Sequence, residues 1–223
     1  MTIRLFLFDL DGTLVDTAPD LALAVNMVRT ARGIAPLPEE ELRPYASRGA
    51  PGLLGKAMGI GRDDPAFLAL RTEFLANYAA HMTDRSRPFE GVPVMLEALR
   101  AAGIRTGVVT NKVEHLALRL TDNLGLDGQL DVVLGSDSEG CAMKPAPDSL
   151  LTAARLTGVP VTDILYAGDD PRDVAAAHAA GMPCAACTWG YAVTPPESWG
   201  ADLVAHSPAE LATWAVQLNA HAL

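Results

Sequence analysis

The chain has 223 residues, of which 49% are hydrophobic and 20% are charged, and its formal net charge is −10. This composition is typical of a globular protein and excludes a disordered chain. The excess of acidic residues argues against nonspecific binding to nucleic acid or to an anionic membrane surface. It does not exclude an anionic small-molecule substrate, because a bound metal and a few placed cations reverse the local field.

The sequence has no apolar run near 18 residues, and it begins directly with a predicted strand instead of a basic, apolar leader. We therefore expect a cytoplasmic protein, monomeric or dimeric, without membrane contact. Its three cysteines do not make a disulfide framework. Cys184 and Cys187 have the spacing of a redox or zinc motif, but they lie in a predicted strand, where residues three apart face opposite sides. We expect them to be buried and inert.

The first predicted element is a strand over residues 5–8, where four large apolar residues follow Ile3. Four such residues are too few for a helix, and a strand buried on both faces is typical of a parallel sheet. The strand ends at Asp9 and Asp11, and Gly12 lets the backbone turn away. Two carboxylates therefore lie at the carboxyl end of a buried strand, where open α/β sheets bind ligands.

Residues 15–86 show no strand signal and predict a small all-helical cap domain inserted into the chain. Apolar residues at helical spacing predict one helix that ends at Arg32–Gly33 and others over residues 39–45 and 63–81. The glycine-rich stretch from Gly49 to Gly55 is expected to be a cap loop facing the active site. Residues 1–14 and 87–223 are then the core domain.

From residue 91 onward, helical and strand patterns alternate. Helices are predicted over residues 94–102, 113–124, 148–156 and 171–180, and from 208 onward. Strands are predicted over residues 104–110, 130–134, 164–167, 182–187 and 203–205. This alternation predicts an α/β fold with a doubly wound, Rossmann-like, mostly parallel sheet.

Polar groups follow the strands of this core, and parallel strands place all these groups on one edge of the sheet. The groups are Asp9 and Asp11, Thr110 and Asn111, Lys144, and Asp169 and Asp173. Carboxylates are the hard oxygen donors that Mg²⁺ prefers. Lys144 adds a positive charge, and Thr110 and Asn111 add hydrogen-bond donors for phosphate oxygens. The set suits phosphoryl transfer, in which one carboxylate attacks phosphorus and another handles the leaving-group proton.

These residues resemble, in order, the four motifs of the haloacid dehalogenase-like hydrolase superfamily. The matching stretches are Phe8–Thr13, Thr110–Lys112, Lys144–Pro145 and Gly168–Asp173. The resemblance implies a Mg²⁺-dependent phosphomonoester hydrolase that works through an aspartyl phosphate, and the helical insert resembles the small cap of that superfamily.

The same resemblance implies a role for each residue. Asp9 would be the nucleophile, and Asp11 the general acid and then the base. Mg²⁺ would be held by Asp9, the main-chain oxygen of Asp11 and Asp169, with Asp173 in support. Thr110 and Lys144 would bind the transferring phosphoryl group.

Shorter stretches resemble two branches of the superfamily. Residues 16–20 and 108–112 look like phosphoglycolate phosphatases, whereas residues 86–91, 168–170 and 199–202 look more specifically like N-acetylmuramic acid 6-phosphate phosphatases. Asp170 departs from many relatives, which have Ser there. It either alters the metal site or caps the helix that begins at Pro171.

Both candidate substrates carry a carboxylate besides the phosphate. Arg48 on the glycine-rich stretch is the candidate partner of that carboxylate, although a solvated surface arginine is an alternative. The small residues Gly49, Ala50 and Gly52 leave room for a sugar, so the sequence favours the amino-sugar phosphate modestly.

Other functions use parts of the same pattern. A phosphomutase would share the core, and the cap sequence does not exclude one. A dehalogenase needs neither Mg²⁺ nor the second carboxylate, so Asp11 and Asp169 argue against it. A receiver-like or silent phosphate-binding protein is the non-enzymatic alternative, but a receiver has no helical insert after its first strand.

Overall fold

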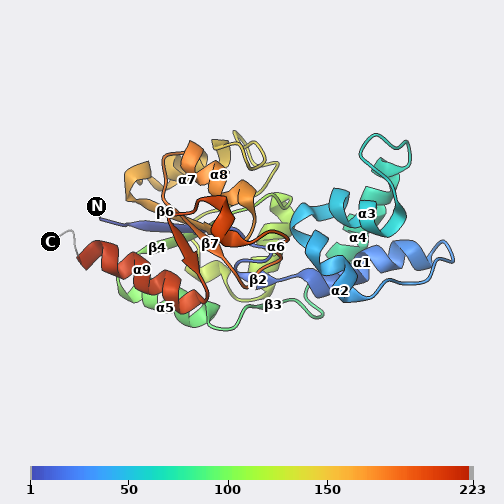
Figure 1. The fold of residues 1–223 in the computed structure, drawn as a ribbon, viewed down its shortest axis with the longest axis horizontal. Coiled ribbons are helices and arrows are strands. Elements are labelled where there is room, and N and C mark those ends of the chain that lie inside the picture. Colours follow the sequence, from blue (N-terminus) through green and yellow to red (C-terminus); the bar gives the residue numbers. More distant parts are fainter. Residues whose placement is uncertain (1, 221–223) are drawn as a thin grey trace.

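The computed structural model describes residues 2–220. Its core is a six-stranded sheet in the order β5-β4-β1-β6-β7-β8, in which every neighbouring pair is parallel (Figure 1). The strands are β1 (Leu5–Phe8), β4 (Arg105–Val109), β5 (Val133–Leu134), β6 (Ile164–Gly168), β7 (Cys184–Cys187) and β8 (Leu203–Ala205). The predicted doubly wound α/β fold is confirmed.

Helices cover both faces of this sheet. They are α5 (Val92–Ala101), α6 (Glu114–Asn123), α7 (Asp148–Thr157), α8 (Pro171–Ala179) and α9 (Pro208–Ala220). Short 3₁₀ turns lie at Asp127–Gln129, Val161–Asp163 and Pro196–Trp199. Phe6 and Phe8 pack into one hydrophobic cluster with α5, α6 and α9, whereas Leu5 and Leu7 pack into a second cluster with α7 and α8. Both faces of β1 are thus buried away from solvent, which is why the strand is apolar at every position.

A helical insert, residues 17–86, projects from one end of the sheet (Figure 1). It contains α1 (Ala18–Thr30), α2 (Glu39–Leu42), a 3₁₀ helix (Arg43–Arg48), α3 (Gly49–Met58) and α4 (Phe67–His81). The chain leaves the core through β2 (Val15–Asp16) and returns through β3 (Arg87–Pro88), and these two strands pair antiparallel. The expectation of no strand within residues 15–86 is therefore wrong, because the two residues of β2 are too few to leave a periodic pattern.

Helix α3 corrects the expectation that residues 49–55 form a loop. Ala50, Leu53, Leu54 and Ala57 are buried, and their spacing of three, four and seven residues is that of one helix face. Burying this face outweighs a glycine penalty of about 1 kcal/mol per residue. Gly52 is needed there, because a Cβ at this position would overlap the Cβ of Arg48.

The junction between insert and core is tightly bonded. Asp20 is fully buried and accepts hydrogen bonds from the backbone N–H of Arg85 (3.1 Å) and from the N–H and hydroxyl of Ser86 (2.7 Å each). The Tyr191 hydroxyl accepts from the N–H of Thr17 at 2.7 Å and donates to Asp16 at 2.8 Å. These bonds hold the start of α1 against both the returning chain and the core.

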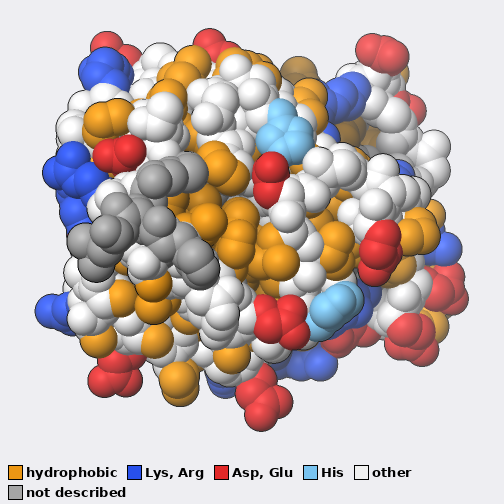
Figure 2. Space-filling model, turned by 60° about the vertical axis from the view of Figure 1, so that its left-hand side comes forward, with side chains coloured by type: hydrophobic (Ala, Val, Ile, Leu, Met, Phe, Trp, Pro, Cys, Tyr) orange, Lys and Arg blue, Asp and Glu red, His pale blue; other side chains and the backbone are white. Residues whose placement is uncertain are grey.

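Cys184 and Cys187 are buried in the two different clusters, one on each face of β7, as predicted. Burial raises the pKa of both thiols. Among residues 2–220, no helix combines the length and apolar character needed to cross a membrane. Figure 2 shows one face of the molecule, on which acidic and basic side chains lie dispersed among uncharged ones.

Candidate active site

The site lies where the chain order reverses within the sheet. Strand β1 stands between β4 and β6, and the chain fills the sheet first on the β4 side and then on the β6 side. Ligands of open α/β sheets bind in the crevice at such a switch point, outside the carboxyl ends of the strands. Asp9, Thr110 and Asp169 directly follow β1, β4 and β6, so the structure brings them to this crevice together.

Three buried carboxylates form an acidic triad there. Asp9, Asp169 and Asp173 each offer an oxygen, and these oxygens lie within 4.8 Å of one another. Burial raises the pKa of Asp9 to about 6, with Lys144 opposing and Asp173 adding to the rise. Burial and then the charges of Asp9 and Asp173 raise the pKa of Asp169 well above its usual value. A divalent cation would relieve this repulsion, so the triad fits a metal ion that prefers oxygen ligands.

The carboxylate of Asp169 is held in place by three donors. They are the Thr13 hydroxyl (3.2 Å), the Tyr191 backbone N–H (2.8 Å) and the Ser47 hydroxyl (3.1 Å). Gly12, with φ at +91°, passes so close that any Cβ would overlap this carboxylate. Glycine at this position therefore permits both the positive φ of the turn and the close approach of the Asp169 carboxylate.

Lys144 is the cation inside the triad. Its Nζ lies 2.6 Å from Asp173, 3.0 Å from Asp9 and 2.7 Å from the Tyr166 hydroxyl. Burial alone would lower the pKa of Lys144, but the two carboxylates outweigh it and raise that pKa. Lys144 supplies one positive charge against the three negative charges of the triad. A further cation would therefore be electrostatically favourable here.

Asn111, which was predicted to contact the substrate, lines the cavity and also bonds the backbone of Lys144. Its Oδ1 accepts from the backbone N–H of Lys144 at 2.8 Å, and its Nδ2 donates to the carbonyl of the same residue at 3.1 Å. Both ends of the amide are thus engaged, and they fix the loop that carries the lysine.

Asp11 faces the cavity next to Lys112, a residue whose role was not predicted from the sequence. Lys112 Nζ lies 3.0 and 3.1 Å from the two Asp11 oxygens and 4.3 Å from the centre of the Tyr78 ring. The Thr17 hydroxyl donates to Asp11 at 2.6 Å. Lys112 lies two residues after Thr110, close to a strand end, and this position is the feature of the sequence that could have indicated a role at the site.

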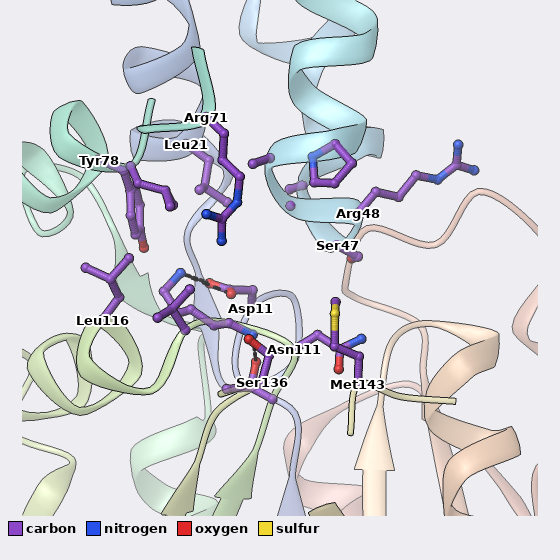
Figure 3. A pocket seen from close by; sticks show the side chains of 18 of the residues that line it. Asp11, Leu21, Ser47, Arg48, Arg71, Tyr78, Asn111, Leu116, Ser136 and Met143 are labelled. Atoms are coloured by element: carbon purple, nitrogen blue, oxygen red, sulfur yellow. Dashed lines mark hydrogen bonds and ion pairs between the residues drawn. The ribbon is translucent and has the colours of Figure 1, made fainter. Parts of the chain in front are cut away.

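A cavity of about 200 Å³ separates this sheet edge from the helical insert. Figure 3 shows the Arg71 side chain of α4 reaching down into the cavity above Asp11, whereas Arg48 extends away from its centre. The guanidinium of Arg48 lies 5.6 Å from the centre of the Tyr45 ring. Gly49 lines the cavity only with its backbone, at the start of α3. Arg71 was not predicted from the sequence, although it shares a helix face with Phe67 and Phe74.

Asp170 has a structural role at this edge. It is the N-cap of α8 and forms a capping box with Asp173. The Arg172 guanidinium donates to Asp170 at 2.7 Å and to the Ser47 carbonyl at 2.8 Å. Arg172 therefore links α8 to the insert, and the capping interpretation of Asp170 is confirmed.

Comparison with known proteins places the chain in a family. The family model for haloacid dehalogenase-like hydrolases matches residues 3–181. The chain is 42% identical over 210 residues to a phosphoglycolate phosphatase from Xanthomonas campestris pv. campestris, covering 93% of this chain and 94% of that one. It is 38% identical over 214 residues to the N-acetylmuramic acid 6-phosphate phosphatase of Pseudomonas aeruginosa, covering 95% and 94%.

A solved structure has the same fold throughout. The crystal structure of a predicted phosphoglycolate phosphatase from Haemophilus somnus 129PT superposes with a TM-score of 0.86 at 28% identity, covering 96% of this chain and 98% of that one. The motifs, the fold and these matches agree. This chain is a member of the haloacid dehalogenase-like hydrolase family.

Proposed function

We propose that this chain is a Mg²⁺-dependent phosphatase that hydrolyses a small phosphate monoester carrying a carboxylate. The observation that carries the proposal is the buried triad of Asp9, Asp169 and Asp173, two of which pair with Lys144. Asp9 of this triad lines the cavity that the insert covers. Mg²⁺ held by Asp9, Asp169 and the main-chain oxygen of Asp11 would neutralise charge between the phosphate and these carboxylates. Asp173, bonded to Lys144, would support this site.

Four side chains have separate roles in the first step. Asp9 attacks phosphorus, so that a bond forms between its carboxylate oxygen and phosphorus while the bond to the alkoxide leaving group breaks. Lys144, 3.0 Å from Asp9, and the Thr110 hydroxyl bind the equatorial phosphate oxygens and stabilise their charge. The leaving alkoxide takes a proton from Asp11.

In the second step, Asp11 accepts a proton from water, which attacks the phosphorus of the aspartyl phosphate and releases inorganic phosphate from Asp9. The ion pair with Lys112 and the bond from Thr17 hold the Asp11 carboxylate toward the cavity.

In this proposal, residues 15–86 act as a cap domain and residues 1–14 with 87–223 as the hydrolase core. The two paired strands β2 and β3 support this division, because both crossings of the chain lie side by side. The core supplies the residues for phosphoryl transfer, and the cap recognises the rest of the substrate.

The cavity wall supports N-acetylmuramic acid 6-phosphate as the first candidate substrate. Apolar side chains from the insert and the core line the cavity, among them Leu21, Phe67, Phe74, Leu75 and Met143. An amino sugar would bury its ring face and two methyl groups against such a wall. The single methylene of 2-phosphoglycolate would leave most of the wall in water.

The cavity volume supports 2-phosphoglycolate as the second candidate. About 200 Å³ lies below the roughly 300–1,000 Å³ typical of drug-sized ligand sites. The smaller ester fits the observed arrangement of insert and core, whereas the amino sugar requires the insert to tilt outward or the sugar to extend through the mouth of the cavity.

The test is phosphate release from both esters, each with Mg²⁺ and with EDTA, by the wild type and by Asp9→Asn. We expect Mg²⁺-dependent release by the wild type alone. A preference for 2-phosphoglycolate above about tenfold in kcat/KM, or 1.4 kcal/mol, would reverse the order of the candidates. Equal activity in EDTA would contradict the metal-dependent mechanism.

A further inference from the structure

Arg71 is placed to face a bound substrate. It lies on α4 and lines the cavity, and Figure 3 shows its guanidinium pointing from the insert toward the floor where Asp11 lies. It follows Phe67 by four residues and precedes Phe74 by three, so it shares their helix face. That face is the apolar wall of the cavity, which places one cation within otherwise apolar surroundings.

No hydrogen bond or ion pair joins Arg71 to another residue in the described part of the chain, although its side chain is half-buried. Glu73, the acid closest to it on α4, is already bonded to Arg32 at 2.7 Å. A partly desolvated guanidinium without an anion is costly. A bound anion would offset that cost and gain a bidentate hydrogen bond.

Two other cations that line the cavity, Arg48 and Arg62, are exposed, whereas three further cations nearby are paired with carboxylates. Lys144 bonds Asp9 and Asp173, Lys112 bonds Asp11, and Arg172 bonds Asp170. The phosphoryl group belongs at the floor, where Asp9 of the triad lines the cavity. Arg71 faces that floor from the opposite wall, so it meets a different part of the substrate.

We infer that Arg71 binds the carboxylate of the substrate and thereby selects for carboxylate-bearing phosphate esters. This inference rests on the proposed function and assigns to Arg71 the contact that the sequence suggested for Arg48. An anionic group opposite the phosphate forms a fork-shaped pair with Arg71 and lies against the apolar wall. An ester without a carboxylate leaves the guanidinium unpaired.

The experiment uses two pairs of substrates that differ in the carboxylate. N-acetylglucosamine 6-phosphate lacks the lactyl group of N-acetylmuramic acid 6-phosphate, and ethyl phosphate has a methyl group in place of the carboxylate of 2-phosphoglycolate. The kcat/KM of wild type, Arg71→Gln and Arg71→Lys is measured on all four. Arg100→Gln removes an exposed positive charge on α5 and serves as the matched control.

We expect Arg71→Gln to lose at least about 30-fold in kcat/KM on the carboxylate-bearing member of the preferred pair, the equivalent of about 2 kcal/mol. Most of this loss should be in KM, because the contact exists before and during the reaction. Activity on the carboxylate-free partner should change by less than about threefold. Arg71→Lys should recover part of the loss, since lysine keeps the positive charge but cannot form the two parallel hydrogen bonds of a guanidinium.

Failure of this inference differs from failure of the proposed function. If the wild type prefers carboxylate-bearing esters but Arg71→Gln loses equally on both members of a pair, the inference is wrong and the function stands. A selective loss in Arg48→Gln instead would move the contact to Arg48. If the wild type does not distinguish the members of either pair, the proposed substrate class is wrong.

Discussion

The hydroxyl of Ser47 donates a 3.1 Å hydrogen bond to Asp169, so the insert contacts a carboxylate of the acidic triad directly. This bond exists only while the insert lies against the core. Its strength therefore contributes to the closed arrangement, together with the bond from Arg172 to the Ser47 carbonyl. The position of the insert and the state of the metal site are linked through one side chain.

Replacing Ser47 by Ala should weaken closure. A hydrogen bond to a charged group contributes about 1.5–3 kcal/mol, and solvent at the open site reduces this, so we expect kcat/KM to fall about 5- to 30-fold. Thr72→Ala removes an exposed hydroxyl from α4 and is the control. An unchanged kcat/KM in Ser47→Ala would show that the bond does not contribute to closure.

Asp9→Asn should abolish turnover while the fold persists, because Asn keeps the shape and loses the attacking charge. We expect kcat to fall by more than about a thousandfold, or roughly 4 kcal/mol of barrier. Thermal unfolding of the variant reports whether the fold is intact. A variant with a well-formed fold and a smaller loss would remove Asp9 from the role of nucleophile.

Metal binding should be visible in stability. Mg²⁺ binds the folded triad and not the unfolded chain, so saturating Mg²⁺ should raise the Tm of the wild type over its value in EDTA. Asp169→Asn should remove that rise, because it deletes one ligand. In EDTA near pH 7, the same variant should be more stable than the wild type, since it removes one of three clustered charges. A Mg²⁺ response that persists in Asp169→Asn would place the cation elsewhere.

The pH dependence follows from Asp9. Its pKa is raised by burial from 3.8 to about 6 in the folded protein, so its stabilising contribution is present below pH 3.8 and is lost as the pH rises through 6. Metal-free wild type should thus lose about 1 kcal/mol relative to Asp9→Asn between pH 5 and pH 7. Urea unfolding in EDTA at both pH values measures this difference. A constant difference would contradict the raised pKa.

The core was predictable because its signals are local. Most of the strands are short apolar runs, and β1, β4, β5, β6 and β7 each end in or are followed by Asp, Thr or Gly, so the sheet and its polar edge could be predicted from the pattern. Asp9, Asp169 and Thr110 were identified in this way. Asp173 lies five residues beyond β6 and Lys144 ten residues beyond β5, but the motifs mark both.

The insert was harder to predict because its structure depends on contacts distant in sequence. Three glycines within α3 indicate a loop, yet burial of Leu53 and Leu54 makes the segment helical. Arg71 and Arg48 both lie in the insert, and only packing shows which one points into the cavity. The role of Asn111 likewise became clear only when its amide was seen to hold the Lys144 loop.

The paired crossings at β2 and β3 make the insert a module with a single stalk. Both of its ends leave the core at one place, and the buried carboxylate of Asp20 fastens them to each other through Arg85 and Ser86. A sequence change within the insert therefore reaches the sheet through this stalk and through contacts such as those of Ser47 and Tyr78 with the core. Substitutions in the insert can therefore change substrate specificity while the residues at the sheet edge stay the same. Grafting another insert between residues 16 and 87 should change the specificity in the same way.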